Sequence, residues 1–163
     1  MRLVALLPAV AVMLASPVAA ENDRLDWPLR PRPAVVRVFD APSPNWHSGH
    51  RGVDLAGTAG QPVYAGRSGT VVFAGELAGR PVVSIAHAGG LRTTYEPVRP
   101  SVRAGQRVET GAPLGELLVG HPGCAVAACL HWGAMWGAAA DARYVDPLGL
   151  VASTPIRLKP LHG

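Results

Sequence analysis

Short strand-like segments separated by glycine turns run through most of this chain. No segment between them keeps the apolar period of an amphipathic helix. The 19 Gly and 16 Pro residues accompany 48% hydrophobic residues, which favours tight turns between strands over disorder. We therefore predict an all-β fold, a single compact sandwich-like or barrel-like domain of short antiparallel strands. The predicted strands lie at residues 34–39, 62–65, 70–74, 81–87, 91–96, 107–109, 114–119 and 130–136. The segment from His87 to Leu91, with two glycines that allow positive φ angles, predicts a hairpin that holds His87 in its turn.

The N-terminus has the pattern of a secretory signal peptide. Met1-Arg2 is followed by an apolar run from Leu3 to Leu14 and by small residues up to Ala20, where a signal peptidase would cut. The run is too short to span a membrane, and no Cys lies near the cut to carry a lipid. We therefore expect a secreted protein, associated with the cell wall.

The remaining chain is long enough for one domain with a core. Charges and prolines before residue 34 predict an extended linker, and the end of the chain predicts a loose tail. No later run is apolar enough for a membrane helix. The predicted organisation is a signal peptide at 1–20, a linker at 21–33, the β domain at 34–150 and a tail at 151–163.

The net charge of +4 comes almost wholly from arginine, because Lys159 is the only lysine. These arginines are spread along the chain. Nucleic-acid binding usually requires a clustered basic face with interleaved aromatic residues, which is not found here. We predict no nucleic-acid partner, and a mildly basic exported protein near an anionic cell wall.

Two short motifs predict a metal site. His50 and Asp54 are four residues apart, and Gly52 between them would leave room for close backbone approach to a metal. Cys129 and His131 follow far downstream. In a strand Cys129 and His131 would project to one face, and Leu130 and Trp132 would project to the other. Two imidazoles and a carboxylate are a common shell for Zn²⁺ with one open position. The residues alone therefore suggest a zinc site.

These motifs belong to a longer pattern that resembles the lysostaphin-type (LytM-like) zinc endopeptidases. The resemblance implies the β-rich duplicated hybrid motif, one Zn²⁺ held by His50, Asp54 and His131, and cleavage of peptide cross-links in bacterial peptidoglycan. The zinc would polarise a peptide carbonyl and lower the pKa of a bound water. The matching segments are residues 50–56, 60–65, 69–75, 91–95, 102–115, 130–133 and 144–148.

Two assisting histidines of that family are replaced here, by Pro97 and Cys129. Proline has no titratable group, and a disulfide-bonded cysteine could not assist either. Glu96 and His121 are the candidate substitutes. Alternation from Tyr95 would turn Glu96 away from the site unless Pro97 breaks it, and His121 has an alternative role as an exposed loop histidine.

Cys124 and Cys129 are the only cysteines, and export favours a disulfide between them. The alternative is a free Cys129 thiolate as a fourth zinc ligand, which would close the site. Trp46, Tyr95 and Trp132 are predicted to wall a groove, with the core as the alternative for Trp46 and Trp132.

The sequence leaves three hypotheses for the function of this chain. The first is a secreted zinc peptidase acting on peptidoglycan cross-links. The second is a noncatalytic zinc-containing module that binds peptidoglycan or regulates a wall hydrolase. The third, a sugar-transport phosphocarrier domain with a related fold, acts inside the cell, and the export signal speaks against it.

Overall fold

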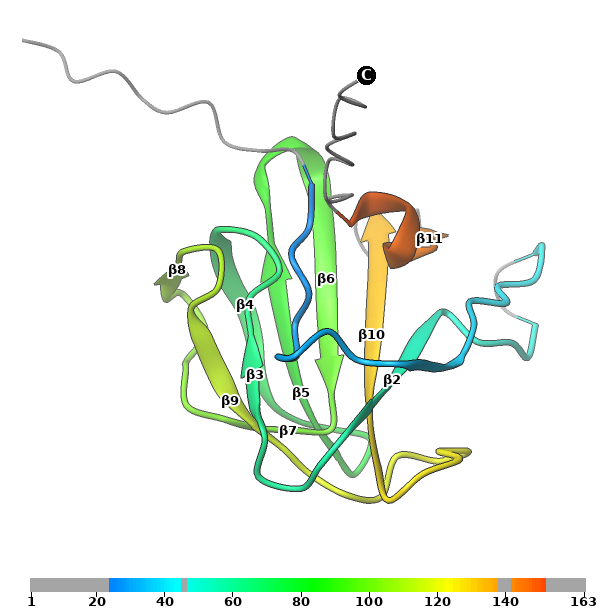
Figure 1. Ribbon diagram of the computed structural model, residues 1–163. Coiled ribbons are helices and arrows are strands. Elements are labelled where there is room, and N and C mark those ends of the chain that lie inside the picture. Colours follow the sequence, from blue (N-terminus) through cyan, green and yellow to red (C-terminus); the bar gives the residue numbers. More distant parts are fainter. Residues whose placement is uncertain (1–23, 45–46, 138–141, 152–163) are drawn as a thin grey trace, which may run out of the picture.

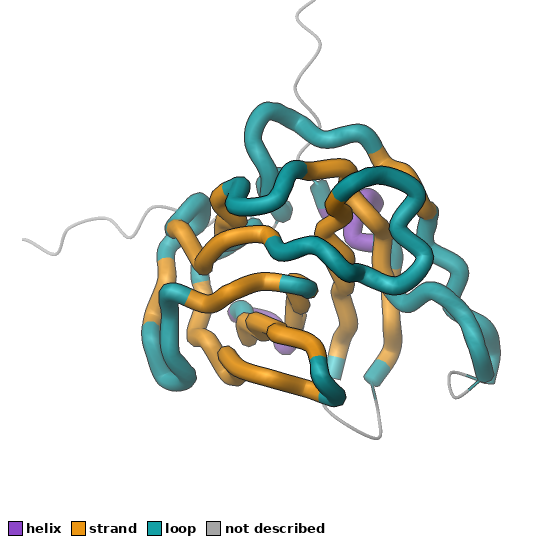
Figure 2. The backbone as a smooth tube through the Cα atoms, turned by 90° about the horizontal axis from the view of Figure 1, so that it is seen from below, coloured by secondary structure: helices purple, strands orange, loops and turns teal. Residues whose placement is uncertain are grey.

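The computed structural model describes residues 24–44, 47–137 and 142–151 and contains two antiparallel sheets (Figure 1). The larger sheet has the order β1-β2-β10-β6-β5-β4-β8, with β11 paired to β10, and the smaller has the order β3-β9-β7. Helix is confined, within the described residues, to the short turns η1 (Ala88–Gly90) and η3 (Pro147–Leu150), as Figure 2 shows. The all-β prediction is confirmed. The strands are β1 (Val35–Arg37), β2 (Gly52–Gly57), β3 (Pro62–Tyr64), β4 (Gly69–Leu77), β5 (Arg80–Ala86), β6 (Leu91–Glu96), β7 (Val98–Pro100), β8 (Arg107–Val108), β9 (Pro113–Leu117), β10 (Ala128–Trp136) and β11 (Arg143–Val145).

The hydrophobic core combines side chains from both sheets. The larger sheet contributes residues such as Leu55, Ile85 and Trp132, and the smaller contributes Val63 and Leu117. All five are fully buried, and burying a large apolar side chain is worth about 1.5–3 kcal/mol. The core therefore fixes one face of the larger sheet and leaves the other face available for a site.

Strand alternation decides which side chains of β6 reach the core. Buried and partly exposed residues alternate along β6, so Thr93 and Tyr95 point inward and Arg92 and Glu96 point to the opposite face. On β10, Trp132 is the direct partner of Tyr95, and His131 is the direct partner of Glu96. Directly opposed residues of paired strands lie on the same face, so His131 and Glu96 share the face that is turned away from the core.

The segment before β1 packs against the domain, which corrects the predicted linker. Leu25 and Leu29 have no exposed surface, and the ring of Trp27 lies 6.3 Å from that of Trp132. The backbone N–H of Leu25 also donates to the Leu150 carbonyl at 2.7 Å. The apolar side chains, rather than the prolines, decide the placement of this segment. The predicted signal peptide and most of the predicted tail lie outside the described residues.

The predicted hairpin after β5 is confirmed, with Gly89 and Gly90 at φ 77° and 85°. His87, which was expected in this turn, is buried beneath it. Its ring contacts the Ser68 carbonyl and the Thr93 hydroxyl, both at 2.7 Å. These hydrogen bonds give His87 a structural position in the core.

No helix in the described part of the chain has both the length and the apolar character required to cross a membrane.

Candidate metal centre

Three predicted ligands converge at one point on the outer face of the larger sheet. His50 Nε2 lies 2.9 Å from Asp54 Oδ1 and 3.0 Å from His131 Nδ1, and His131 Nδ1 lies 2.9 Å from the same carboxylate oxygen. Register produces this convergence, because Asp54 on β2 and His131 on β10 are direct cross-strand partners. His50 lies just before β2, where it forms an isolated antiparallel bridge with Asp40.

Neighbouring groups orient these side chains toward a shared point. His50 Nδ1 lies 2.7 Å from the Val38 carbonyl, so it donates its proton there and leaves the Nε2 lone pair facing the cluster. Metal-binding histidines are commonly held in this way. Asp54 has no exposed side-chain surface, and its second oxygen, Oδ2, has no hydrogen-bond partner. A buried carboxylate oxygen without a partner is costly, and a bound cation would satisfy it.

Gly52 makes room for the His131 ring. A Cβ atom at position 52 would lie 2.7 Å from His131 Nε2 and 2.5 Å from the Trp132 carbonyl oxygen. We expected Gly52 to allow close approach of the backbone to the metal. Instead, the missing side chain leaves space for the His131 ring and for the backbone of β10.

His121 joins the cluster from the loop between β9 and β10. Its Nε2 lies 3.2 Å from Asp54 Oδ1, and its ring stacks on His131 with centroids 5.1 Å apart. Only 7% of its side chain is exposed, so the exposed-loop alternative is wrong. One ligand atom from each of His50, Asp54, His121 and His131 lies within 4.8 Å of the others.

A disulfide anchors the loop that carries His121. Cys124 and Cys129 are bonded, with Cα atoms 5.7 Å apart, which confirms the predicted pair. The free Cys129 thiolate is therefore excluded as a fourth ligand. Because Cys129 lies at the start of β10, the bridge ties the loop to the strand that carries His131.

Glu96 faces the cluster, contrary to the expectation that alternation would turn it away. Tyr95 lies in the core, so the next residue necessarily points to the outer face. Glu96 Oε1 is 3.1 Å from the Arg80 guanidinium and 3.6 Å from His121 Nδ1. Glu96 and His121 thus form a pair of titratable groups beside the three predicted ligands.

The electrostatics of the metal-free cluster favour charged groups. Burial acts to raise the pKa of Asp54, but contacts with His121 and His131 prevail and lower it well below its ordinary value. Burial also acts to raise the pKa of Glu96, but contacts with His121 and then with Arg80 prevail, so that this pKa is lowered. The same contacts, first Asp54 and then Glu96, raise the pKa of His121 to about 9.

Two of the three predicted groove residues lie elsewhere. Tyr95 and Trp132 are fully buried, because each occupies the inward position next to Glu96 or His131. The Tyr95 hydroxyl instead accepts from the Gly66 N–H and the Thr93 hydroxyl, both at 3.0 Å. Trp46 lies outside the described residues.

A groove of about 520 Å³ nevertheless runs along the outer face of the sheet from the cluster. Glu96 and His131 line one part of it, and Arg51, Arg92 and Tyr144 line another. No motif in the sequence indicated these last three residues. Strand pairing explains their positions, because Arg92 on β6 and Tyr144 on β11 are both direct partners of Met135 on β10, and Arg51 lies over the Tyr144 ring.

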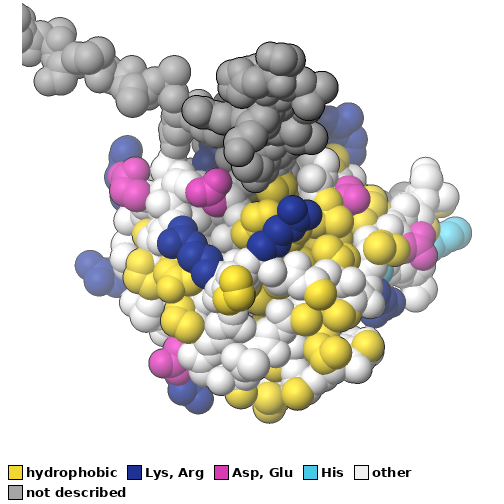
Figure 3. Space-filling view, viewed as in Figure 1, with side chains coloured by type: hydrophobic (Ala, Val, Ile, Leu, Met, Phe, Trp, Pro, Cys, Tyr) yellow, Lys and Arg dark blue, Asp and Glu magenta, His cyan; other side chains and the backbone are white. Residues whose placement is uncertain are grey.

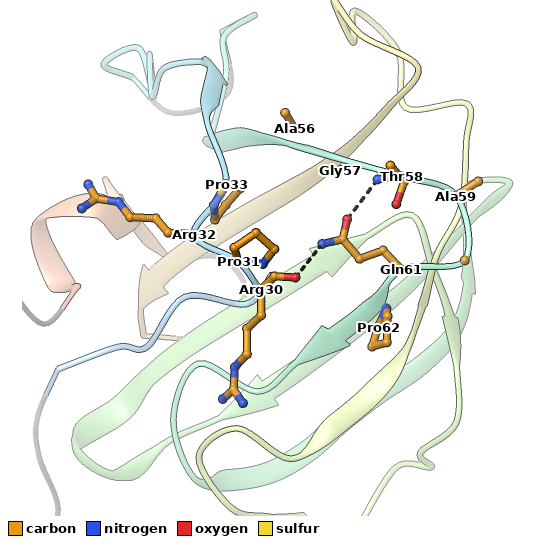
Figure 4. Close-up of a pocket in the computed structure, with 11 residues that line it drawn as sticks. Arg30, Pro31, Arg32, Pro33, Ala56, Gly57, Thr58, Ala59, Gln61 and Pro62 are labelled. Atoms are coloured by element: carbon orange, nitrogen blue, oxygen red, sulfur yellow. Dashed lines mark hydrogen bonds between the residues drawn. The ribbon is translucent and has the colours of Figure 1, made fainter.

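A second hollow lies where the N-terminal segment crosses the loop after β2 (Figure 4). Gln61 closes it by donating to the Arg30 carbonyl and accepting from the Thr58 N–H. Its lining, residues 30–33 and 56–62, contains no His, Cys, Asp or Glu, so it offers neither a soft ligand nor a general base. On the face shown in Figure 3, arginine side chains are interspersed with acidic and hydrophobic ones.

Comparison with known proteins identifies the family. A model of peptidase family M23 matches residues 48–147, which include all four residues of the cluster. The chain therefore belongs to peptidase family M23, a family of zinc-dependent peptidases, and the resemblance to lysostaphin-type enzymes is confirmed.

Two curated relatives are the uncharacterized proteins Rv2891 of Mycobacterium tuberculosis (strain H37Rv) and Mb2915 of Mycobacterium bovis. Each is 71% identical to this chain over 147 residues, which make up 90% of this chain and 59% of the relative. The chain thus spans about three-fifths of the length of these relatives.

Solved structures share the fold. The SpoIIQ–SpoIIIAH pore forming complex matches with a TM-score of 0.65 and 26% identity, over 80% of this chain and 92% of the other. Csd3 of Helicobacter pylori gives 0.62 and 24%, over 87% and 39%, and lysostaphin gives 0.61 and 23%, over 85% and 62%. The last two similarities bear on the fold alone.

Proposed function

We propose that this chain is an exported zinc metalloendopeptidase that cleaves peptide cross-links of bacterial peptidoglycan. The observation that carries the proposal is the convergence of His50, Asp54 and His131 on one point, with a buried Asp54 oxygen left without a partner. Membership of family M23 supports a peptidase that acts on peptidoglycan. The proposed export depends on the signal-peptide pattern of residues 1–20.

The donor set suits one zinc ion. Two imidazole nitrogens and one carboxylate oxygen form the usual protein shell of a catalytic zinc, with bonds of roughly 2 Å. When bound, the zinc would polarise the scissile carbonyl and lower the pKa of a bound water. His50, whose tautomer is held by the Val38 carbonyl, and the buried Asp54 would supply two ligands, and His131 would supply the third.

Glu96 and His121 would replace the missing assisting histidines. Both lie beside the proposed ligands, and their nearest titratable atoms are 3.6 Å apart. Glu96 is placed to accept a proton from a nucleophilic water, and His121 to donate one to the leaving nitrogen or to stabilise negative charge on the carbonyl oxygen. Groups in such roles commonly contribute a hundredfold or more to the rate. Arg80 would keep Glu96 ionised and ready to accept.

Zinc content and cleavage test this proposal together. Elemental analysis should give one zinc per chain, and purified peptidoglycan should release new amino termini in a reaction that chelator stops. His131→Ala should lose both zinc and cleavage, whereas His47→Ala, at an exposed loop histidine outside the cluster, should retain both. Cleavage that persists in His131→Ala would exclude the proposed centre.

A noncatalytic zinc module is the second candidate, favoured by the position of His121. If His121 joined the three predicted ligands, four protein ligands would close the site and leave no position for substrate. The SpoIIQ structure, which belongs to a pore forming complex, is a precedent for this fold within an assembly.

His121→Ala separates the two candidates. In the peptidase, this substitution should leave the zinc content unchanged and reduce turnover about a hundredfold. In a closed site it should weaken zinc binding and open a position for water, which the visible spectrum of the cobalt-substituted protein would report.

A further inference from the structure

The groove beside the candidate metal centre ends at a pair of arginines. Arg92 on β6 is the direct partner of Met135 on β10, and Met135 is the direct partner of Tyr144 on β11. These three side chains therefore form a row across the sheet and line the groove. The guanidinium of Arg51 lies over the Tyr144 ring, 5.5 Å from its centroid. Arg92 and Arg51 therefore lie on opposite sides of Met135.

This row lies at a fixed distance from the cluster. His131 and Glu96 form one row of the sheet, Gly133 and Thr94 the next on the same face, and Met135 and Arg92 the one after. Four residues at roughly 3.4 Å each separate the first row from the last by about 14 Å. Gly133 has no side chain, and the groove continues past it from the cluster to the arginines. An extended peptide would cover this distance with about four residues.

The charged lining of the groove consists of Arg51, Arg92 and Glu96. Glu96 is paired with Arg80 at 3.1 Å, and Arg51 donates to the His47 carbonyl at 2.6 Å besides lying over Tyr144. Arg92 is partly buried and forms no ion pair with an acidic residue of the described chain. A partly buried guanidinium in a groove is suited to bind a carboxylate through two parallel hydrogen bonds.

We propose that Arg92, with Arg51 on the opposite side of Met135, binds a carboxylate of the substrate peptide about four residues from the bond that is cut. This inference rests on the proposed function and narrows it to peptides that carry a free carboxylate at that position. Amidation of that carboxylate would remove its charge and one of its acceptor oxygens, and would weaken recognition.

Binding of paired peptides tests the inference separately from cleavage. The probes are cross-linked peptide dimers prepared from peptidoglycan, fluorescently labelled, with their side-chain carboxylates either free or amidated. Fluorescence anisotropy with the zinc-loaded full chain gives Kd for each form. The wild-type protein should prefer the free acid by roughly tenfold or more, within the range of one charge-assisted hydrogen bond. The preference should decrease with added salt.

Three variants identify the residue responsible. Arg92→Gln should abolish the preference for the free acid, and Arg92→Lys should restore part of it, because the charge returns without the planar fork. Arg143→Gln, at an exposed position on β11 that does not line the groove, should keep the full preference.

Equal affinity of the wild-type protein for the two dimers, absence of binding to both, or a preference that survives in Arg92→Gln would overturn the inference. Any of these results would reject the carboxylate site even if the dimers were cleaved. Cleavage of the dimers would then still support the proposed peptidase. Conversely, a preference that depends on Arg92 without any cleavage would support the carboxylate site and count against the peptidase.

Discussion

Replacing Gly52 with alanine tests how the two ligand strands fit together. The added Cβ would lie 2.5 Å from the Trp132 carbonyl oxygen and 2.7 Å from His131 Nε2. The carbonyl belongs to the backbone of β10, which is paired with β2 at this position. The methyl group can therefore be accommodated only if the strands separate or the His131 ring moves.

Two opposing effects determine how much Gly52→Ala changes the free energy of unfolding. Alanine loses less backbone entropy on folding than glycine, which would stabilise the protein by about 0.5–1 kcal/mol. Overpacking of a closely packed site costs about 1–3 kcal/mol. We therefore expect Gly52→Ala to lower the free energy of unfolding of the metal-free protein by about 1–2 kcal/mol. Displacement of His131 should also weaken zinc binding roughly 10–100-fold, as changes beside a ligand commonly do.

Urea denaturation in the presence of chelator gives the first quantity, and competition with a chromophoric zinc chelator gives the second. Gly149→Ala is the matched control, because no heavy atom lies within 4 Å of its added Cβ. A Gly52→Ala protein within about 0.5 kcal/mol of wild type, with unchanged zinc affinity, would refute the steric argument. Reduced stability without zinc binding in either protein would instead remove the metal assignment.

Three further outcomes are expected. Leu29→Ala should cost about 2–5 kcal/mol in urea unfolding because its side chain is fully buried, and a loss below about 0.5 kcal/mol would show that the N-terminal segment is not part of the core. Reduction of the Cys124–Cys129 bridge should cost about 2 kcal/mol for so short a loop, seen as a lower melting temperature with reductant and absent from the double serine variant. In metal-free protein the raised pKa of His121, about 9 against 6.5 when unfolded, gives a stabilisation that is complete below about pH 6.5 and lost as the pH rises through about 9. Urea unfolding from pH 6 to 10 measures that loss, and an identical pH dependence in His121→Gln would assign it to another group.

Residue patterns were sufficient to predict the direction of side chains where one face of a strand is buried. Alternation around His131 predicted that Leu130 and Trp132 would face away from the metal site, and both lie in the core. The same rule failed at Glu96 because Tyr95 was assigned to the groove, and an error of one residue inverts a whole strand. Only the cross-strand partner of each residue fixes that choice.

Other parts of the site could not be read from local sequence. His121 lies in a loop without a periodic pattern, and its approach to Asp54 depends on the path set by the disulfide and by β10. The proline content of the first described residues suggested a linker, whereas Leu25, Trp27 and Leu29 contribute enough apolar surface to fold back onto the domain. For this N-terminal segment, tertiary packing overrides what composition predicts.

The hydrogen bond between Leu25 and Leu150 brings the two ends of the domain together, beside the bridge from Leu25 to Val151. Neighbouring ends are the property that allows a domain to be grafted into a surface loop of a host protein, or to be circularly permuted, with its interior unchanged. A permuted version with these ends joined by a short glycine-rich peptide, and with new ends opened at Gly79 in the β4–β5 hairpin, should preserve the pairing of β2 with β10. Additional sequence, such as the curated relatives carry, could then attach at either end and emerge from a single edge of the domain.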